Sequence, residues 1–216
     1  MSNLLYANFS RMIRNKLFLI GMGFMFFAGS FLCFQQYRQL VGYHAQVKLD
    51  STFFTYTLMI GVISAIFCSL FVGVEYNDGT MRNKIIAGHK RTEIYFSNLI
   101  VNIVASFLMC GSYILANVVV GIPMIGALTI PINKVLLIVF GSLITVVAFC
   151  SIFTMISLLV SSKAIAPIIC ILFVFLSIAF LNEVQRILDN PKVWYDGTVN
   201  TCLLYTSPSP RDTERS

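Results

Sequence analysis

Residues 53–74 read FFTYTLMIGVISAIFCSLFVGV, an apolar run that contains no Asp, Glu, Lys or Arg. A helix rises about 1.5 Å per residue, so roughly 20 apolar residues cross a hydrocarbon core that is about 30 Å thick. An ionised side chain near the bilayer centre costs about 2.5–3.5 kcal/mol on insertion scales. An uncharged run of this length therefore predicts a transmembrane helix.

Four further apolar runs also lack these charged residues, at 17–34, 95–122, 135–160 and 164–181. Over the whole chain 57% of residues are hydrophobic and 11% are charged, whereas an average soluble domain has about 25% charged residues. Strands of a membrane barrel would alternate over about ten residues, but these runs are continuous. We expect an all-α, polytopic membrane protein with five transmembrane helices.

The segment 3–16, before the first run, has a helical pattern of its own. Its apolar positions are Leu5, Phe9, Met12 and Ile13, and its polar positions are Asn8, Arg11, Arg14 and Asn15. This pattern predicts an amphipathic helix on the membrane surface, with a frayed polar terminus as the alternative. The run 17–34 is too long for a secretory signal and no small-residue cleavage site follows it, which favours a retained helix.

Basic residues in short loops indicate orientation, because such loops tend to stay in the cytoplasm. With the N-terminus inside, the cytoplasmic loops hold eight Lys and Arg residues and the opposite loops hold five. The cytoplasmic set is Arg11, Arg14, Lys16, Arg82, Lys84, Lys90, Arg91 and Lys163, and the opposite set is Arg38, Lys48, Lys134, Arg186 and Lys192. We expect a cytoplasmic N-terminus, with the loop 75–93 also in the cytoplasm.

The loop 75–93 reads EYNDGTMRNKIIAGHKRTE and combines helix-capping residues with a short apolar pattern. Asp78 or Thr80 would cap a helix, Gly79 would allow a tight bend, and Gly88 suits the end of the helix. Between them, the segment 81–87 predicts about two helical turns, with Met81 and Ile85 on one face, Ile86 alongside, and Thr92 and Glu93 starting the next span. Because an isolated helix this short is barely stable, we expect another molecule to dock on it.

The polar residues Glu75, Arg82, Asn83, Lys84 and Arg91 of this loop have two interpretations. Glu75 would pair locally with Arg82, Lys90 or Arg91, or would be exposed among lipid headgroups. Four side chains would contact a partner protein or anionic lipids of the inner leaflet, namely Arg82, Asn83, Lys84 and Arg91.

Small residues recur every four positions in the second run, at Gly61, Ala65, Ser69 and Gly73. They would form a helix-packing face that lets another helix approach closely. The neighbour would be a second subunit, a transport pathway, or another helix of the same chain.

Cysteine and histidine residues suggest no metal or catalytic site. Five cysteines fall within predicted spans, with no CxxC pair or adjacent histidine: Cys33, Cys68, Cys110, Cys150 and Cys170. They are expected to be buried small apolar residues. His44 and His89 lie in loops on opposite sides of the membrane.

Two stretches resemble the ABC exporter permeases of the type-2 class: NLLYANFSRMIRNKLF at 3–18 and EYNDGTMRNKIIAGHKRTEIYFSNLIV at 75–101. The resemblance implies a transmembrane permease domain over 1–181, in which 3–16 is the interfacial helix and 75–93 carries a coupling helix. In that class the coupling helix sits in a groove of a separate ATPase subunit. It further implies a homo- or heterodimer of permease subunits in a bacterial plasma membrane, with the lipid bilayer and the ATPase as partners.

The chain has no GxxxxGK[ST] phosphate loop, so it is expected to be a transport subunit that binds no cofactor, with ATP bound by its partner. No nucleic acid is expected among its partners. A membrane-embedded enzyme or an ion-coupled carrier would need ionisable groups at bilayer depth, which the spans lack. A non-transporting structural or assembly subunit remains the alternative, although it would not need the capped loop.

The end of the chain differs from the rest. The stretch CLLYTSPSPRD, which begins at Cys202, is similar to a translated sequencing adapter, so we expect residues 202–216 to be an artefact. A genuine Pro/Ser-rich tail is the alternative. Residues 182–201 would begin an extracellular loop or domain, and the sixth span that is usual in the class would be missing.

Overall fold

The computed structural model describes residues 2–43, 49–88, 90–126, 130–160, 162 and 164–189. Each regular element among them is helical, which confirms the all-α prediction. The elements are α1 (Ser2–Ile13), α2 (Lys16–Tyr43), α3 (Leu49–Phe53), α4 (Tyr56–Asn77), α5 (Thr80–Ile86), α6 (Arg91–Ala116), the π-helical turn η1 (Asn117–Gly121), α7 (Ile122–Ile125), α8 (Ile132–Leu159) and α9 (Ile165–Asp189).

Within these described residues, 5 helices are long and apolar enough to cross a membrane. They are Lys16–Gly42, Tyr56–Tyr76, Arg91–Ile125, Ile132–Leu159 and Ile165–Leu188, one for each apolar run of the sequence. Two helices extend well past the predicted ends, because α2 continues to Tyr43 and α9 to Asp189. Polar residues at a helix end can remain helical where the chain meets water, so the apolar run underestimates the helix.

The chain divides into two compact units, Met1–Ile178 and Ala179–Ser216. In the first unit α2 packs along α6, α4 packs along α8, and α6 also contacts α4 and α8. Its core is apolar and includes Met25, Phe71, Tyr113 and Phe153, none of which has exposed surface. In the second unit the described part of α9 is exposed and carries one ion pair, between Arg186 and Glu183 at 3.3 Å.

The four small residues of the second run lie on α4 and are all buried. A Cβ atom added to Gly61 would lie 3.4 Å from a methyl of Val174, so α9 approaches α4 closely there. Ala65 and Ser69 have no exposed surface, and the Ser69 hydroxyl donates to the Ala65 carbonyl at 2.6 Å. Gly73 is buried as well. At Gly61, the neighbour of this face is therefore α9 of the same chain.

The third span consists of α6, η1 and α7, which follow one another without a gap, and η1 is a π-helical turn between two α-helices. A π-turn inserts an extra residue into a helix and turns its side chains relative to the preceding face. Here it coincides with close packing, since a Cβ atom on Gly121 would lie 2.8 Å from a Leu49 methyl and 3.0 Å from the Cys33 sulfur.

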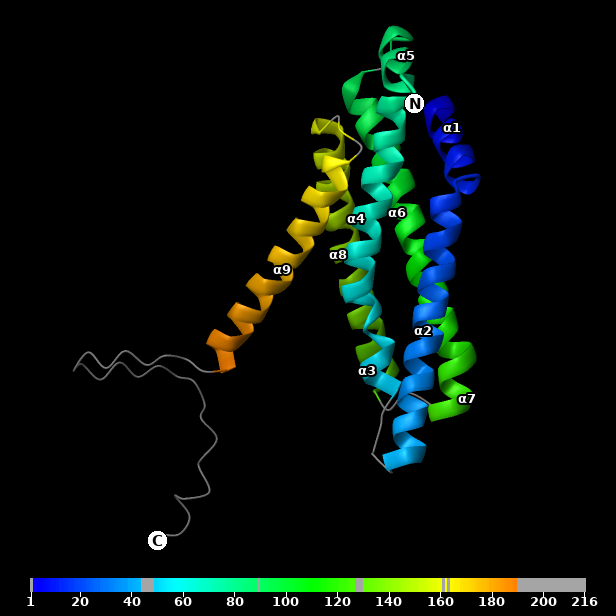
Figure 1. Ribbon diagram of the computed structural model, residues 1–216, viewed down its shortest axis with the longest axis vertical. Coiled ribbons are helices and arrows are strands. Elements are labelled where there is room, and N and C mark those ends of the chain that lie inside the picture. Colours follow the sequence, from blue (N-terminus) through cyan, green and yellow to red (C-terminus); the bar gives the residue numbers. More distant parts are fainter. Residues whose placement is uncertain are drawn as a thin grey trace, which may run out of the picture. The chain divides into compact units, whose positions relative to one another are not determined.

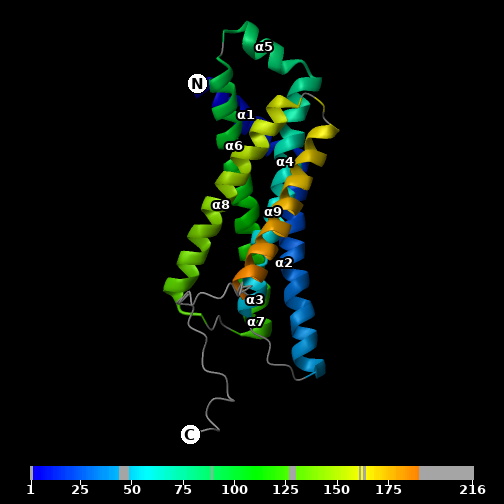
Figure 2. The same ribbon diagram turned by 90° about the vertical axis from the view of Figure 1, so that its left-hand side faces the viewer.

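The helix α5 and the N-terminus of α1 lie at one end of the first unit, whereas α3 and α7 lie at the other (Figure 1). Figure 2 shows that α5 runs across the ends of α4 and α6 instead of continuing along either. The short helix expected in the loop 75–93 is therefore present, and it spans the gap between the second and third spans.

Candidate functional site

Two glycines with left-handed backbone bracket α5. Gly79 has φ 67° and precedes the first helical residue, and Gly88 has φ 85° just beyond the last turn. Residues with a Cβ atom adopt this conformation at a cost, so glycine suits both positions. The Gly88 N–H donates to the Ile85 carbonyl at 3.0 Å, which closes the helix end as expected.

The expected side-chain caps are wrong. Gly79 occupies the N-cap position and makes no side-chain cap hydrogen bond. Thr80 lies inside the helix, and its hydroxyl donates to the Glu75 carbonyl at 3.0 Å, which joins α5 back to α4. The next span begins with Lys90 at its N-cap, again without a side-chain cap, and with Glu93 in its first turn.

One apolar side chain anchors α5 to the bundle. Met81 is 8% exposed and packs with Leu4 of α1 and Ile94 of α6, with Tyr76 and Leu158 beside them. Ile85 and Ile86, which were expected on or near the same face, are 48% and 82% exposed. The prediction of a shared buried face for Met81 and Ile85 is therefore wrong, since α5 contacts the bundle through Met81 while Ile85 and Ile86 stay largely exposed.

Beneath α5 lies a buried carboxylate. Glu75, in the last turn of α4, has no exposed surface. Its Oε1 atom is 2.6 Å from Nη1 of Arg11 and 2.5 Å from Nζ of Lys84, and its Oε2 atom accepts a 3.2 Å hydrogen bond from Nδ2 of Asn98. Both carboxylate oxygens therefore have partners, as a buried charge requires.

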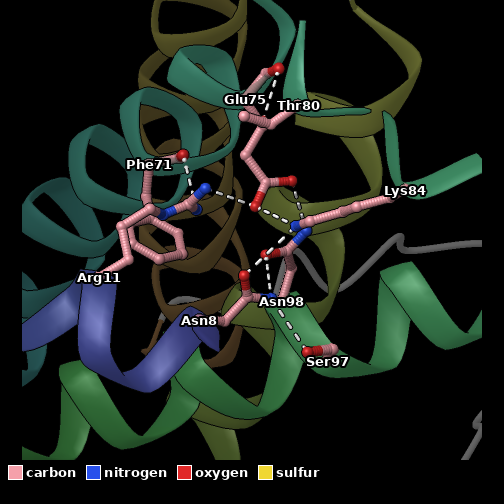
Figure 3. Close-up of polar contacts among 8 residues, drawn as sticks. All are labelled: Asn8, Arg11, Phe71, Glu75, Thr80, Lys84, Ser97 and Asn98. Atoms are coloured by element: carbon pink, nitrogen blue, oxygen red, sulfur yellow. Dashed lines mark hydrogen bonds and ion pairs between the residues drawn. The ribbon is translucent and has the colours of Figure 1, made fainter. Parts of the chain in front are cut away.

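The cluster extends through amide side chains (Figure 3). Asn8 of α1 donates from Nδ2 to the Ser97 hydroxyl at 2.9 Å and to Oδ1 of Asn98 at 3.1 Å. Its own Oδ1 accepts from Nζ of Lys84 at 3.3 Å. One polar network thus ties α1, α4, α5 and α6 together.

Arg11 has a second attachment to α4. Its Nη2 atom donates to the Phe71 carbonyl at 3.3 Å, and its guanidinium carbon lies 4.0 Å from the centre of the Phe71 ring. A guanidinium over an aromatic face is attracted by the ring electrons. Arg11 and Lys84 remain 30% and 15% exposed, so the positive charge in excess of Glu75 stays in contact with water.

The structure changes the roles expected for the loop charges. The expected pairing of Glu75 with Arg82, Lys90 or Arg91 is wrong, and so is its exposure among headgroups. Lys84, expected to project outward, turns inward to Glu75. Arg82, Asn83 and Arg91 are exposed.

Asn8 and Asn98 were missed by sequence reasoning. The sequence pattern predicts Asn8 on the polar face of its helix, yet it is 2% exposed, whereas Ile13 of the predicted apolar face is 61% exposed. The sequence does contain a pattern that indicates buried polar residues, because Asn98, Asn102 and Ser106 recur every four residues in the apolar run 95–122. All three are fully buried, and Asn102 donates to the Thr154 hydroxyl at 2.9 Å. Asparagine in a membrane span usually faces another helix.

His44 and His89 lie outside the described residues. Within the described part of the chain, the five cysteines are free and buried. They thus occupy the interior, as the composition of the spans suggested.

A comparison with protein-family models matches residues 4–179 to the model of the ABC-2 family transporter protein. Neither the comparison with curated proteins nor the one with solved structures found a match. The matched residues run from α1 into α9 and include the whole polar network beneath α5. The chain therefore belongs to the ABC-2 family of transporter proteins, as a multi-pass membrane permease.

Proposed function

We propose that this permease couples ATP hydrolysis by a separate ATPase subunit to export of a substrate, and that α5 is its coupling helix. ATP is bound by the partner, and the permease itself carries out no chemistry. The observation that carries this proposal is a short helix, exposed on its outer face, that is fastened to three other helices by a buried charge network.

The outer face of α5 has the composition of a docking site. Ile86 is 82% exposed, with the polar residues Arg82 and Asn83 nearby on the same short helix. An apolar side chain that can enter a partner's pocket, surrounded by polar groups, is typical of the residues that dominate a protein interface. An exposed isoleucine in this position supports a protein partner in the aqueous phase.

The inner face of α5 supports transmission of force. A push on α5 reaches α4 through Lys84 and Glu75, α1 through Asn8, and α6 through Met81 and its contact with Ile94. Paired buried charges resist separation, so these helices would move as one body when an ATPase dimer closes. Such a movement can change the side of the membrane to which a central pathway opens.

The remaining features of the proposal concern orientation, assembly and location. The N-terminus and α5 lie in the cytoplasm of a bacterial cell, two permease subunits form a homo- or heterodimer, and the assembly resides in the plasma membrane. The excess of basic residues in the loops on the α5 side supports this orientation.

Co-purification with the ATPase subunit tests the proposal. The chain is co-expressed with a cytoplasmic ABC ATPase subunit, and the permease is captured by a tag. Ile86→Asp and Arg82→Glu should each reduce the captured ATPase at least tenfold, since central interface residues cost more than about 2 kcal/mol when lost. Lys134→Glu is the control, because Lys134 is exposed at the start of α8. Equal capture by Ile86→Asp and the control would contradict the proposal.

A further inference from the structure

We infer that a cavity between α5 and α8 is a binding site for one anionic phospholipid of the surrounding membrane. The cavity has a volume of 820 Å³ and is bounded by the end of α4, by α5, by the start of α6 and by the end of α8. Pockets that hold small molecules usually measure about 300–1,000 Å³. The cavity is distinct from the Glu75 network, whose carboxylate points to Arg11 and Lys84.

The position of the cavity matches the membrane surface. Three candidate spans end at its walls: Tyr76 is the last residue of one, Arg91 the first of the next, and Leu159 the last of a third. Lipid headgroups lie where spans end, and tyrosine and arginine are common at that level. The inference rests on these spans crossing the membrane, as the proposed function does. The cavity shares Arg82 with the proposed ATPase-docking face of α5, so Arg91 and Met155 are the positions that test it separately.

The charge of the cavity selects an anion. Arg82 and Arg91 line it, and no acidic residue does. Among the described residues neither guanidinium takes part in an ion pair or hydrogen bond. The two tyrosines are already engaged, since the Tyr76 hydroxyl donates to the Leu158 carbonyl and the Tyr95 hydroxyl donates to the Ser151 carbonyl. The two guanidiniums are therefore the polar groups left to receive a ligand, and their geometry suits a phosphate.

The apolar wall of the cavity selects a lipid over a free phosphate ion. Met155 and Leu159 of α8 line it and are 56% and 73% exposed, and the buried Ile94 of α6 also lines it. An acyl chain lying along α8 would cover the two exposed side chains. A free phosphate would leave them in water, so the combination of cations and exposed apolar surface fits an amphiphile.

Native mass spectrometry of the purified full chain tests the site without the ATPase. Phosphatidylglycerol is titrated into detergent micelles, with phosphatidylcholine of the same acyl chains and inorganic phosphate as comparisons. We expect one phosphatidylglycerol to bind most tightly. Each basic residue near a membrane surface contributes about 1 kcal/mol to the binding of an anionic lipid, which is about fivefold in affinity. Arg91→Gln should therefore weaken phosphatidylglycerol binding about fivefold, and the double variant Arg91→Gln with Arg82→Gln about 25-fold. Lys90→Gln is the matched control, because Lys90 is exposed beside Arg91 but does not line the cavity.

A second variant tests the apolar wall. Met155→Trp should fill the cavity and weaken phosphatidylglycerol binding while leaving both arginines in place. Equal binding of phosphatidylcholine, full competition by inorganic phosphate, or equal losses in Arg91→Gln and Lys90→Gln would each overturn the inference. The inference would also be overturned if Arg91→Gln kept its lipid binding but lost ATPase capture, because the cavity would then be part of the protein interface. If lipid selectivity fails while Ile86→Asp still loses the ATPase, only this inference is refuted.

Discussion

Replacement of Glu75 by glutamine tests whether the buried charge network holds α5 in place. Glu75→Gln keeps the shape of the side chain but leaves Arg11 and Lys84 without their counter-charge. Removing one partner of a buried ion pair costs about 3–5 kcal/mol. Arg11 and Lys84 are 30% and 15% exposed and can recover part of their hydration, so we expect the lower end, about 3 kcal/mol.

Thermal unfolding of the purified chain in detergent measures this loss. For a chain of this size, each kcal/mol of lost unfolding free energy lowers the melting midpoint by about 2–4 °C, so the midpoint should fall by about 6–12 °C. Glu183→Gln is the matched control, because Glu183 and Arg186 form a 3.3 Å pair with 55% and 67% exposed side chains. Such a pair contributes at most about 1 kcal/mol. If both variants melt at the same temperature, the network does not stabilise this end of the bundle.

Substitutions at Gly79, Asn102 and Gly121 test three individual features. Gly79→Ala should lower the unfolding free energy by about 1–2 kcal/mol, because Gly79 has a φ of 67°. Gly79→Asn should lower it by less, because asparagine tolerates this conformation better than alanine. Equal losses in the two variants would contradict the role of this backbone conformation. Asn102→Leu should cost about 0.6 kcal/mol through loss of a hydrogen bond to α8, and an unchanged denaturation midpoint would count against that bond. Gly121→Ala should lower the unfolding free energy by about 1–3 kcal/mol, because its Cβ would lie 2.8 Å from Leu49. Gly23→Ala is the control and should be close to neutral, because its Cβ would meet nothing within 4 Å. Equal denaturation midpoints for the two variants would contradict this role of Gly121.

The membrane architecture could be predicted from the sequence because it depends on local composition. Each uncharged run became one span, since a helix satisfies its own backbone hydrogen bonds and needs no distant partner in lipid. The existence of α5 and the role of Gly88 were also local properties, set by a few residues of turn chemistry. Helix ends were less accurate, because α2 and α9 continue through polar residues that carry no hydrophobic signal.

The network beneath α5 could not be predicted because its members come from distant parts of the chain. The loop sequence predicts pairing of Glu75 with Arg82, Lys90 or Arg91, whereas the structure pairs it with Lys84 of that loop and with Arg11, which packing of α1 against α6 brings to it. The same reasoning turned Asn8 outward on the rule that polar residues face water. In this bundle Asn98 and Ser97 provide the hydrogen-bond partners that make an inward orientation favourable.

Labelling of residue 86 tests whether α5 is the cytoplasmic docking site of an ATPase subunit. Ile86→Cys is introduced with Cys202 replaced by serine, and a membrane-impermeant maleimide is added to inside-out and right-side-out vesicles. The five described cysteines are buried and should react little. We expect labelling in inside-out vesicles only, and loss of that labelling when the ATPase subunit is added. Labelling from the outer side, or labelling that the ATPase leaves unchanged, would contradict it.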